Sequence, residues 1–224
     1  MPALLFDAYG TLFDVHSVVL RAGAGIAGDL DALSQLWRQK QLEFTWLRAL
    51  MDRYQDFWQI TETALYTALA QLHIEASESQ LRRLLDGYLE PAVFPDARAA
   101  LDALHDFPRA ILSNGSPAML EAAVRNSGLE SYFSSVISVD QVKTYKPSPR
   151  VYQLGVDTLL LPAEEILFVS SNAWDAAGAK AFGYRVCWCN RSGRPMDRLG
   201  FAPDVVVTSL DQIPCWLRLA DNPT

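Results

Sequence analysis

Short apolar runs alternate along this chain with longer segments of helical periodicity. Residues 3–6 form the first apolar run, and further runs bounded by turn residues lie at 109–116, 134–140, 166–172, 185–190 and 204–209. Segments 116–128, 149–160 and 174–183 lie between these runs and have helical spacing, and two of them end at a glycine, a common helix stop. Strands alternating with helices predict an α/β fold with a parallel sheet covered by helices on both sides.

The region between residues 15 and 90 has a different pattern. Segments 31–54 and 62–72 carry helical periodicity with large aromatic residues, and 77–89 adds a helix that Ser77 or Ser79 could cap. Two prolines in 90–97 indicate a return linker. We therefore predict a core domain of residues 1–14 and 91–224, with a helical domain of residues 15–90 inserted after the first strand.

Composition and charge narrow the function classes. Apolar residues make up 50% of the 224 positions and charged residues 20%, which is typical of a globular protein. The net charge of −7 argues against a general nucleic-acid partner. The N-terminus has no basic region and its apolar run is short, so we expect neither a signal peptide nor a membrane span. An odd count of three cysteines predicts reduced thiols in a cytoplasmic protein, with Cys187 and Cys189 packed in a strand rather than binding a metal.

Polar residues gather where the predicted strands end. Asp7 follows the first run directly, and a carboxylate at the end of a buried strand is costly unless it is a metal ligand, a base, a nucleophile or a cap. The other candidates at strand ends are Thr11, Ser113, Asn114, Lys146, Ser170, Ser171, Asn172 and Asp175. Because the carboxyl ends of parallel strands meet at one edge of a sheet, these side chains are expected to converge on one pocket.

Four stretches carry a family resemblance. "FDAYGTLFD", "LSNGS", "KPSPRVYQLG" and "FVSSNAWDAAGAKAFG" resemble, in order, the four motifs of the haloacid dehalogenase superfamily. The resemblance implies a Rossmann-like parallel sheet core with a helical cap domain inserted after the first strand. The periodicity of the chain predicts the same arrangement independently.

Two positions depart from the phosphatase members of that superfamily. Those members carry a second Asp where this chain has Tyr9, and a metal-binding acid where it has Ser171. Because magnesium prefers hard oxygen ligands, usually carboxylates, we expect no metal site and no other cofactor. Loss of the second Asp also removes the general acid that would help to expel an alkoxide, whereas a halide leaving group needs no proton.

Further residues narrow the resemblance. "SNAWDA", together with "WRQKQLEFTWLRALM", is similar to the L-2-haloacid dehalogenase family. That family implies hydrolysis of short L-2-haloalkanoic acids to D-2-hydroxyalkanoic acids, through an aspartyl ester and with inversion at C2. Covalent catalysis of this kind divides one hard displacement into two easier steps.

The resemblance assigns catalytic roles. Asp7 matches the nucleophile, although a strand-end Asp could simply cap a turn. Arg38 would meet the departing halide, unless it is a solvated helix residue. Lys146 would allow Asp7 and Asp175 to remain ionised together. Asp175 belongs to the hydrolytic half-reaction, where it could orient water or position Lys146. Thr11, Ser170 and Asn172 would donate hydrogen bonds to Asp7 and the water.

A second group of residues would bind the substrate. Ser113 would hold its carboxylate, Asn114 would help with the halide or with positioning, and Tyr152 would lie near the pocket or pack in a helix. The residues expected beside the alkyl group and halogen are Tyr9, Leu42, Phe57 and Trp174, the last three of which could equally be ordinary core. The partner is then a small halogenated carboxylate, not nucleic acid or membrane.

Three hypotheses stay open from the residues. The protein could be a cofactor-free dehalogenase, a magnesium-dependent small-molecule phosphatase, or an inactive binding module of the same fold. The family resemblance also implies a homodimer. The aromatic-rich segment 42–58 offers an apolar interface for it, unless those side chains pack internally.

Overall fold

The fold is built around one parallel sheet. The computed structural model describes residues 2–221, over which the sheet has the order β5-β4-β1-β6-β7-β8. Its strands are β1 (Ala3–Phe6), β4 (Arg109–Ser113), β5 (Ser135–Ser138), β6 (Ile166–Ser170), β7 (Arg185–Cys189) and β8 (Val205–Val207). In the centre, Phe6 of β1 pairs in parallel with Ile111 of β4 and Val169 of β6. The predicted α/β class is confirmed.

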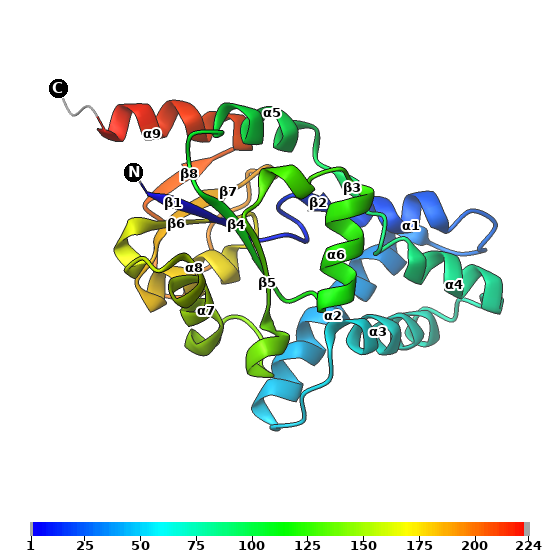
Figure 1. Ribbon diagram of the computed structural model, residues 1–224. Coiled ribbons are helices and arrows are strands. Elements are labelled where there is room, and N and C mark those ends of the chain that lie inside the picture. Colours follow the sequence, from blue (N-terminus) through cyan, green and yellow to red (C-terminus); the bar gives the residue numbers. More distant parts are fainter. Residues whose placement is uncertain (1, 222–224) are drawn as a thin grey trace.

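Helices cover the sheet on both sides (Figure 1). The α-helices are α1 (His16–Ala22), α2 (Leu30–Leu50), α3 (Phe57–Gln71), α4 (Glu78–Asp86), α5 (Pro95–Ala103), α6 (Pro117–Asn126), α7 (Pro149–Leu159), α8 (Ala173–Phe182) and α9 (Ile213–Asp221). Short 3-10 helices are η1 (Glu130–Tyr132), η2 (Val139–Val142), η3 (Ala163–Glu165) and η4 (Leu210–Gln212). Helices α7 and α8 pack on one face, whereas α5 and α9 pack together above the other (Figure 1).

Local sequence explains where several helices begin and end. The hydroxyl of Ser77 accepts from the backbone N–H of Gln80, whose side chain accepts from Ser77 N, so Ser77 rather than Ser79 caps α4. Ser116 caps α6, and Pro117 fits its first turn because the missing N–H has no helical partner there. Gly183 ends α8 with φ of 120°, a backbone conformation that favours glycine.

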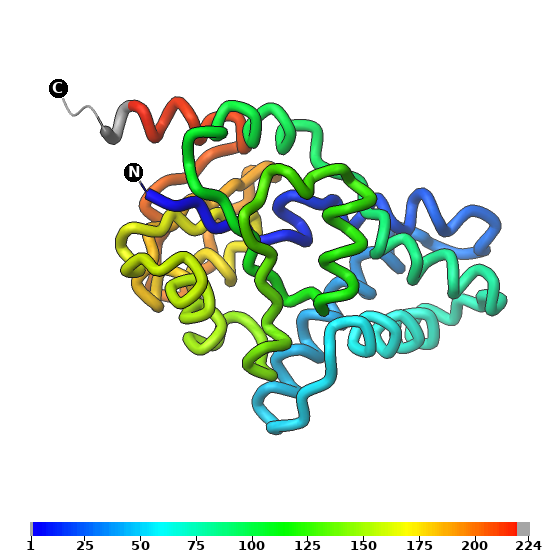
Figure 2. The backbone as a smooth tube through the Cα atoms, in the orientation of Figure 1, coloured from blue at the N-terminus to red at the C-terminus, as the bar shows by residue number. Residues whose placement is uncertain are grey.

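Helices α1 to α4 form a helical block beside the sheet (Figure 2). The chain enters and leaves this block through a two-stranded antiparallel ribbon, in which Phe13 and Asp14 of β2 (Phe13–Asp14) pair with Val93 and Ala92 of β3 (Ala92–Val93). The block interrupts the core between β1 and β4, as the sequence pattern predicts. The exact division at residues 15 and 90 stays a prediction.

The segment predicted as a return linker has more structure than expected. Residues 90–97 contain β3 and the first turn of α5, which begins at Pro95. The segment does return the chain from the helical block to the sheet, but it is not an irregular loop, because proline also starts helices well, its fixed φ being suited to the first turn. This early start of α5 places Asp96 in a partly buried position, where it accepts a hydrogen bond from the backbone N–H of Leu210.

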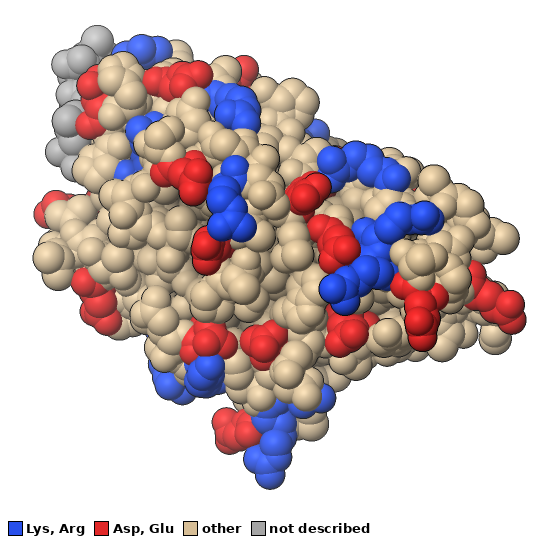
Figure 3. Space-filling view, turned by 45° about the vertical axis from the view of Figure 1, so that its right-hand side comes forward, with Lys and Arg blue, Asp and Glu red and all other residues tan. Residues whose placement is uncertain are grey.

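The surface carries mixed charge. On the face shown in Figure 3, basic side chains lie next to acidic ones, including those on the helical block at the right. Within the described range, no helix combines the length and apolar character needed to cross a membrane. Cys187 and Cys189 are buried in β7, and neither forms a disulfide.

Candidate active site

A small cavity lies where the carboxyl ends of the sheet strands meet α2 and α3. Its volume is about 10 Å³, room for about one water molecule. It is lined by Asp7, Tyr9, Arg38, Leu42, Phe57, Ser113, Asn114, Asn172 and Trp174. All of these residues belong to the predicted site, and the structure brings them together from five separate parts of the chain.

Asp7 is the buried carboxylate of this cavity. It follows β1 directly and is 6% exposed. Its Oδ1 atom accepts a hydrogen bond from Lys146 Nζ at 3.0 Å. Its Oδ2 atom accepts from Thr11 Oγ1 at 3.0 Å and from Asn172 Nδ2 at 2.8 Å. Donors therefore hold both oxygens and fix the orientation of the carboxylate.

Asp175 lies behind Asp7 and is fully buried. Its Oδ2 atom accepts from Lys146 Nζ at 2.9 Å and from Ser170 Oγ at 3.1 Å, and its Oδ1 atom accepts from the Tyr152 hydroxyl at 2.8 Å. Lys146 is thus shared by two carboxylates. Burial favours the neutral amine, but the negative charges of Asp175 and Asp7 outweigh it and raise the pKa of Lys146. Burial raises the pKa of the Asp175 carboxyl, against the opposing charge of Lys146.

Arg38 comes from α2 and brings positive charge to the opposite wall. Its Nη2 atom lies 3.4 Å from the carbonyl oxygen of Tyr9, and its Nη1 atom lies 3.5 Å from Gln41 Oε1. Among the described residues Arg38 has no carboxylate within ion-pair distance, so its charge is uncommitted. Gln41, which the sequence reasoning missed, is buried, accepts from the Tyr88 hydroxyl and donates to Thr61 Oγ1.

Aromatic rings close the cavity. Tyr9 stacks on Phe57 with ring centroids 6.3 Å apart, and its hydroxyl donates to the carbonyl of Tyr88 at 3.1 Å. Burial raises the pKa of Tyr9, so the phenol stays neutral. Trp174 packs edge-on against Trp46 at 5.5 Å. Tyr9 and Phe57 are core residues as well as cavity wall, so both interpretations of Phe57 from the sequence apply at once.

Ser113 and Asn114 form the wall at the end of β4. The hydroxyl of Ser113 accepts from the backbone N–H of Gly115 at 3.1 Å. The side-chain oxygen of Asn114 accepts from the backbone N–H of Lys146 at 3.1 Å. Asn114 therefore joins β4 to the segment that carries Lys146, in addition to facing the cavity.

Arg191, just beyond β7, is a neighbour of the site that the sequence reasoning missed. Its Nη1 atom donates to Ser171 Oγ and its Nη2 atom to the carbonyl of Thr11, both at 3.0 Å. The signal was present, because Arg191 follows the carboxyl end of a parallel strand, as the other candidates do.

The donor set does not fit a magnesium ion. Two carboxylates, Asp7 and Asp175, already share the Lys146 ammonium, and Ser171 accepts from Arg191. Magnesium requires near-octahedral oxygen ligation, often with carboxylates. In the part of the chain that the structure describes, no three His, Cys, Asp or Glu side chains are grouped as metal ligands would be.

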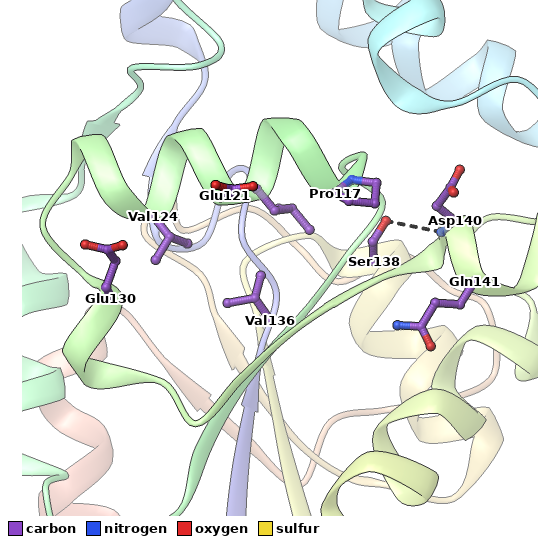
Figure 4. Close-up of a pocket in the computed structure, with 9 residues that line it drawn as sticks. Pro117, Glu121, Val124, Glu130, Val136, Ser138, Asp140 and Gln141 are labelled. Carbon is purple, nitrogen blue, oxygen red and sulfur yellow. Dashed lines mark hydrogen bonds between the residues drawn. The ribbon is translucent and has the colours of Figure 1, made fainter.

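Other hollows lie outside this cavity. Trp174 also lines two larger ones, of about 420 Å³ beside His16 and Arg191 and about 600 Å³ beside Trp46 and Leu199. A groove of about 380 Å³ lies between α6 and β5, where Glu121 and Val136 face each other (Figure 4). It shares no lining residue with the small cavity that Asp7 lines.

Comparison with known proteins decides the family. Residues 1–183 match the family of haloacid dehalogenase-like hydrolases. The chain is 47% identical over 216 residues to (S)-2-haloacid dehalogenase H-109 from Pseudomonas putida, with 96% of each chain covered. It belongs to the L-2-haloacid dehalogenase family. The resemblance inferred from the motifs is confirmed.

Other members of the L-2-haloacid dehalogenase family extend the match. Haloacetate dehalogenase H-2 from Moraxella sp. (strain B) is 47% identical, with 94% of this chain and 95% of the relative covered. A solved structure of L-2-haloacid dehalogenase from Xanthobacter autotrophicus, with chloropropionic acid covalently bound, is 41% identical and superposes with a TM-score of 0.90 over 100% of both chains.

Proposed function

We propose that this protein is an L-2-haloacid dehalogenase that hydrolyses short L-2-haloalkanoic acids to D-2-hydroxyalkanoic acids. One observation carries the proposal: the Asp7 carboxylate and the uncommitted Arg38 guanidinium line the same small cavity. A nucleophile and a cation for the leaving group are what a carbon–halogen displacement requires. The family membership supports the same reaction, since its relatives are named for it.

In the first step, an oxygen of Asp7 attacks C2 of the substrate. A carbon–oxygen bond forms, the carbon–halogen bond breaks with its electron pair leaving on the halide, and C2 inverts. Arg38 stabilises the negative charge that develops on the halide, because an oriented cation in a dry cavity acts most strongly where charge appears. The product of this step is an ester of Asp7.

Lys146 and Asp175 prepare Asp7 for attack. Asp175 accepts hydrogen bonds from Lys146, Ser170 and Tyr152, and it does not line the cavity. These contacts support a role for Asp175 in positioning Lys146, the second of the two roles considered from the sequence. Lys146 in turn compensates the charge of Asp7, which has little access to solvent.

Ser113 and Asn114 take part in substrate binding. Ser113 would bind the substrate carboxylate, and Asn114 would contact the substrate near its halogen. A cavity of about 10 Å³ is far smaller than a haloalkanoate, so the walls must move apart when substrate enters. Arg38, Leu42 and Phe57 come from α2 and α3, outside the sheet. We infer that these helices, with Trp174, form the movable side of the site.

In the second step, water attacks the carbonyl carbon of the Asp7 ester. The bond between that carbon and the product oxygen breaks, the hydroxy acid leaves, and Asp7 is regenerated with one oxygen from water. Each turnover converts one haloacid and one water into one hydroxy acid, one halide and one proton. Asn172 and Thr11, which donate to Asp7 Oδ2, are placed to stabilise charge on this oxygen during hydrolysis.

No step in this scheme uses a metal, because Lys146 and Arg191 occupy the oxygens that would bind one. Tyr9 stands where the phosphatase members carry their general acid, yet its hydroxyl is engaged by the carbonyl of Tyr88. A halide leaves without a proton, so this engagement does not hinder dehalogenation. It does disfavour the alternative of a magnesium-dependent phosphatase.

The test is halide release from both enantiomers of 2-chloropropanoate, with and without a metal chelator. We expect release from the L enantiomer alone, unchanged by chelator, with D-lactate as product. Phosphate release that depends on magnesium, without halide release, would overturn the proposal. In a single turnover with enzyme in excess in ¹⁸O-labelled water, we expect the label in Asp7 and not in the product, and label in the product instead would exclude the ester.

We infer further that the protein forms a homodimer through the end of α2. Leu50 is 83% exposed there and lines the hollow of about 600 Å³ together with Leu199, which is 56% exposed. The aromatic residues of 42–58 offer less exposed surface to a dimer interface than expected, since Phe57 is buried and Trp46 is only partly accessible. Light scattering should give a dimer for the parent chain and a monomer for Leu50→Glu. A parent chain that is monomeric would refute the inference.

A further inference from the structure

A partly buried ion pair behind the catalytic cavity joins three loops at the carboxyl edge of the sheet. Arg191 Nη2 and Nε lie 2.9 and 3.0 Å from the two carboxylate oxygens of Asp96. The side chains are 21% and 13% exposed. Asp96 also accepts from the backbone N–H of Leu210 and the hydroxyl of Ser209, and the Arg191 guanidinium lies 4.0 Å from the ring centroid of Phe94. The guanidinium is therefore held on several sides.

The Nη1 and Nη2 atoms of Arg191 also donate hydrogen bonds to residues next to the catalytic cavity. They bind the carbonyl of Thr11, in the loop after β1, and the hydroxyl of Ser171, in the loop after β6. These two residues also contact each other, because the backbone N–H of Ser171 donates to Thr11 Oγ1 at 2.9 Å. Arg191, Thr11 and Ser171 thus form a closed ring of hydrogen bonds across two loops.

Thr11 connects this ring to the nucleophile. Its hydroxyl accepts from Ser171 N and donates its own hydrogen to Asp7 Oδ2. A hydroxyl has one hydrogen, so the hydrogen bond received from Ser171 favours the orientation in which that hydrogen is directed at Asp7. Arg191 itself does not line the catalytic cavity. Its contact with the reacting groups is therefore indirect, through the residues that it holds.

We propose that Arg191, held by Asp96, is a positioning residue that sets the Thr11 hydroxyl against Asp7 in the dehalogenation reaction. The proposal rests on the proposed function. Guanidinium geometry is essential to it, because one planar group must bind a carboxylate on one side and a carbonyl and a hydroxyl on the other. A lysine ammonium in the same place could not hold all three partners in these directions.

The test compares Arg191→Lys, Thr11→Val and the double variant by steady-state halide release. For Arg191→Lys we expect kcat to fall about tenfold with KM changed less than about twofold, as small misplacement of a reacting group costs rate rather than binding. In the Thr11→Val background we expect the same substitution to change kcat less than about twofold, since no hydroxyl remains to be positioned.

Controls separate positioning from stability. The ion pair of Lys180 with Asp204 is comparable, because the Asp204 carboxylate also accepts from a backbone N–H, but this pair lies outside the site. Asp204→Asn weakens it, and we expect the kcat of this variant to equal that of the parent. If Arg191→Lys fails to fold, Asp96→Asn serves the same double-variant cycle. An unchanged kcat for Arg191→Lys, a loss confined to KM, or an equal loss with and without the Thr11 hydroxyl would each overturn the proposal. A parent enzyme that releases no halide would instead refute the proposed function.

Discussion

The ammonium of Lys146 donates a hydrogen bond to Asp7 at 3.0 Å although 139 positions separate the two residues in the chain. Lys146 is 1% exposed and also contacts Asp175, so a single cation serves two buried carboxylates. Such a cluster is stable only while its cation is present, because an uncompensated buried charge is expensive. We therefore expect stability and catalysis to depend on the same contact.

Replacing Lys146 should reduce both the activity and the stability of the protein. We expect Lys146→Met to abolish halide release and to lower the free energy of unfolding by about 3 kcal/mol, since two carboxylates lose their counter-charge. Urea denaturation followed by circular dichroism measures the second effect. Lys143→Met is the matched control, because Lys143 pairs with Asp140 on the surface and should have little effect on stability or activity. Equal stability of both variants would contradict this account.

The pH dependence of activity should follow Asp175. Burial raises the pKa of Asp175 to about 6, and a protonated Asp175 could not accept from Lys146, Ser170 and Tyr152 together. We expect kcat to rise with pH through about 6 as Asp175 ionises. It should then stay high well into the alkaline range, because the pKa of Lys146 is raised above its ordinary value of 10.5. A rate profile with its maximum below pH 6 would show that ionised Asp175 is not required.

Asp96 should contribute to the pH dependence of stability. Burial alone would raise its pKa, but hydrogen bonds from Arg191, Leu210 and Ser209 prevail and lower it below the ordinary value of 3.8. A carboxyl with a lowered pKa stabilises the folded state above its unfolded pKa and loses that contribution as the pH falls through the folded value. Asp96→Asn should thus lower Tm at pH 7, and the difference from the parent should shrink as the pH falls below 3.8. A constant difference would argue against this linkage.

Trp174 should limit the size of the substrate. Trp174 lines both the cavity of about 10 Å³ and two larger hollows beside it. We expect Trp174→Ala to raise kcat/KM for 2-chlorohexanoate relative to 2-chloropropanoate by about tenfold, a modest value for several methylene groups gaining space. Trp216→Ala provides the control, because Trp216 lies on α9 against Arg185, and it should leave the ratio unchanged. A ratio that Trp174→Ala also leaves unchanged would place the size limit elsewhere.

Several parts of the site could be predicted because they depend on short stretches of chain. Asp7 and Ser113 stand directly beyond or at the end of apolar runs, and parallel strands bring such positions to one edge. That Asn172 and Trp174 both face the cavity was harder to predict, since side chains two positions apart need not point in the same direction. Both face the cavity because Asn172 is the extended N-cap of α8 and Trp174 lies in its first turn, so neither strand nor helix periodicity applies.

Other parts could not be predicted from local pattern. Gln41 looks like any polar residue of a long helix, and only the folded structure shows that it is buried beside Arg38 and bonded to Tyr88 and Thr61. Asp96 lay in a segment interpreted as a linker, so its pairing with Arg191, 95 positions away, had no signal in the local sequence. The contacts of Gln41 with Tyr88 and Thr61, like that of Asp96 with Arg191, join side chains from different elements of the chain.

The sequence by itself determined the order of strands and helices, the helical insertion after β1 and the kinds of side chain at the strand ends. These follow from periodicity and turn residues, which are properties of contiguous segments. Only the tertiary structure decided which donors each oxygen of Asp7 receives, that Arg38 keeps an uncommitted charge, and that Arg191 closes a ring around Thr11. The reason is physical: hydrogen bonds and ion pairs require placement within a few tenths of an ångström, and that placement arises from packing among elements distant in sequence.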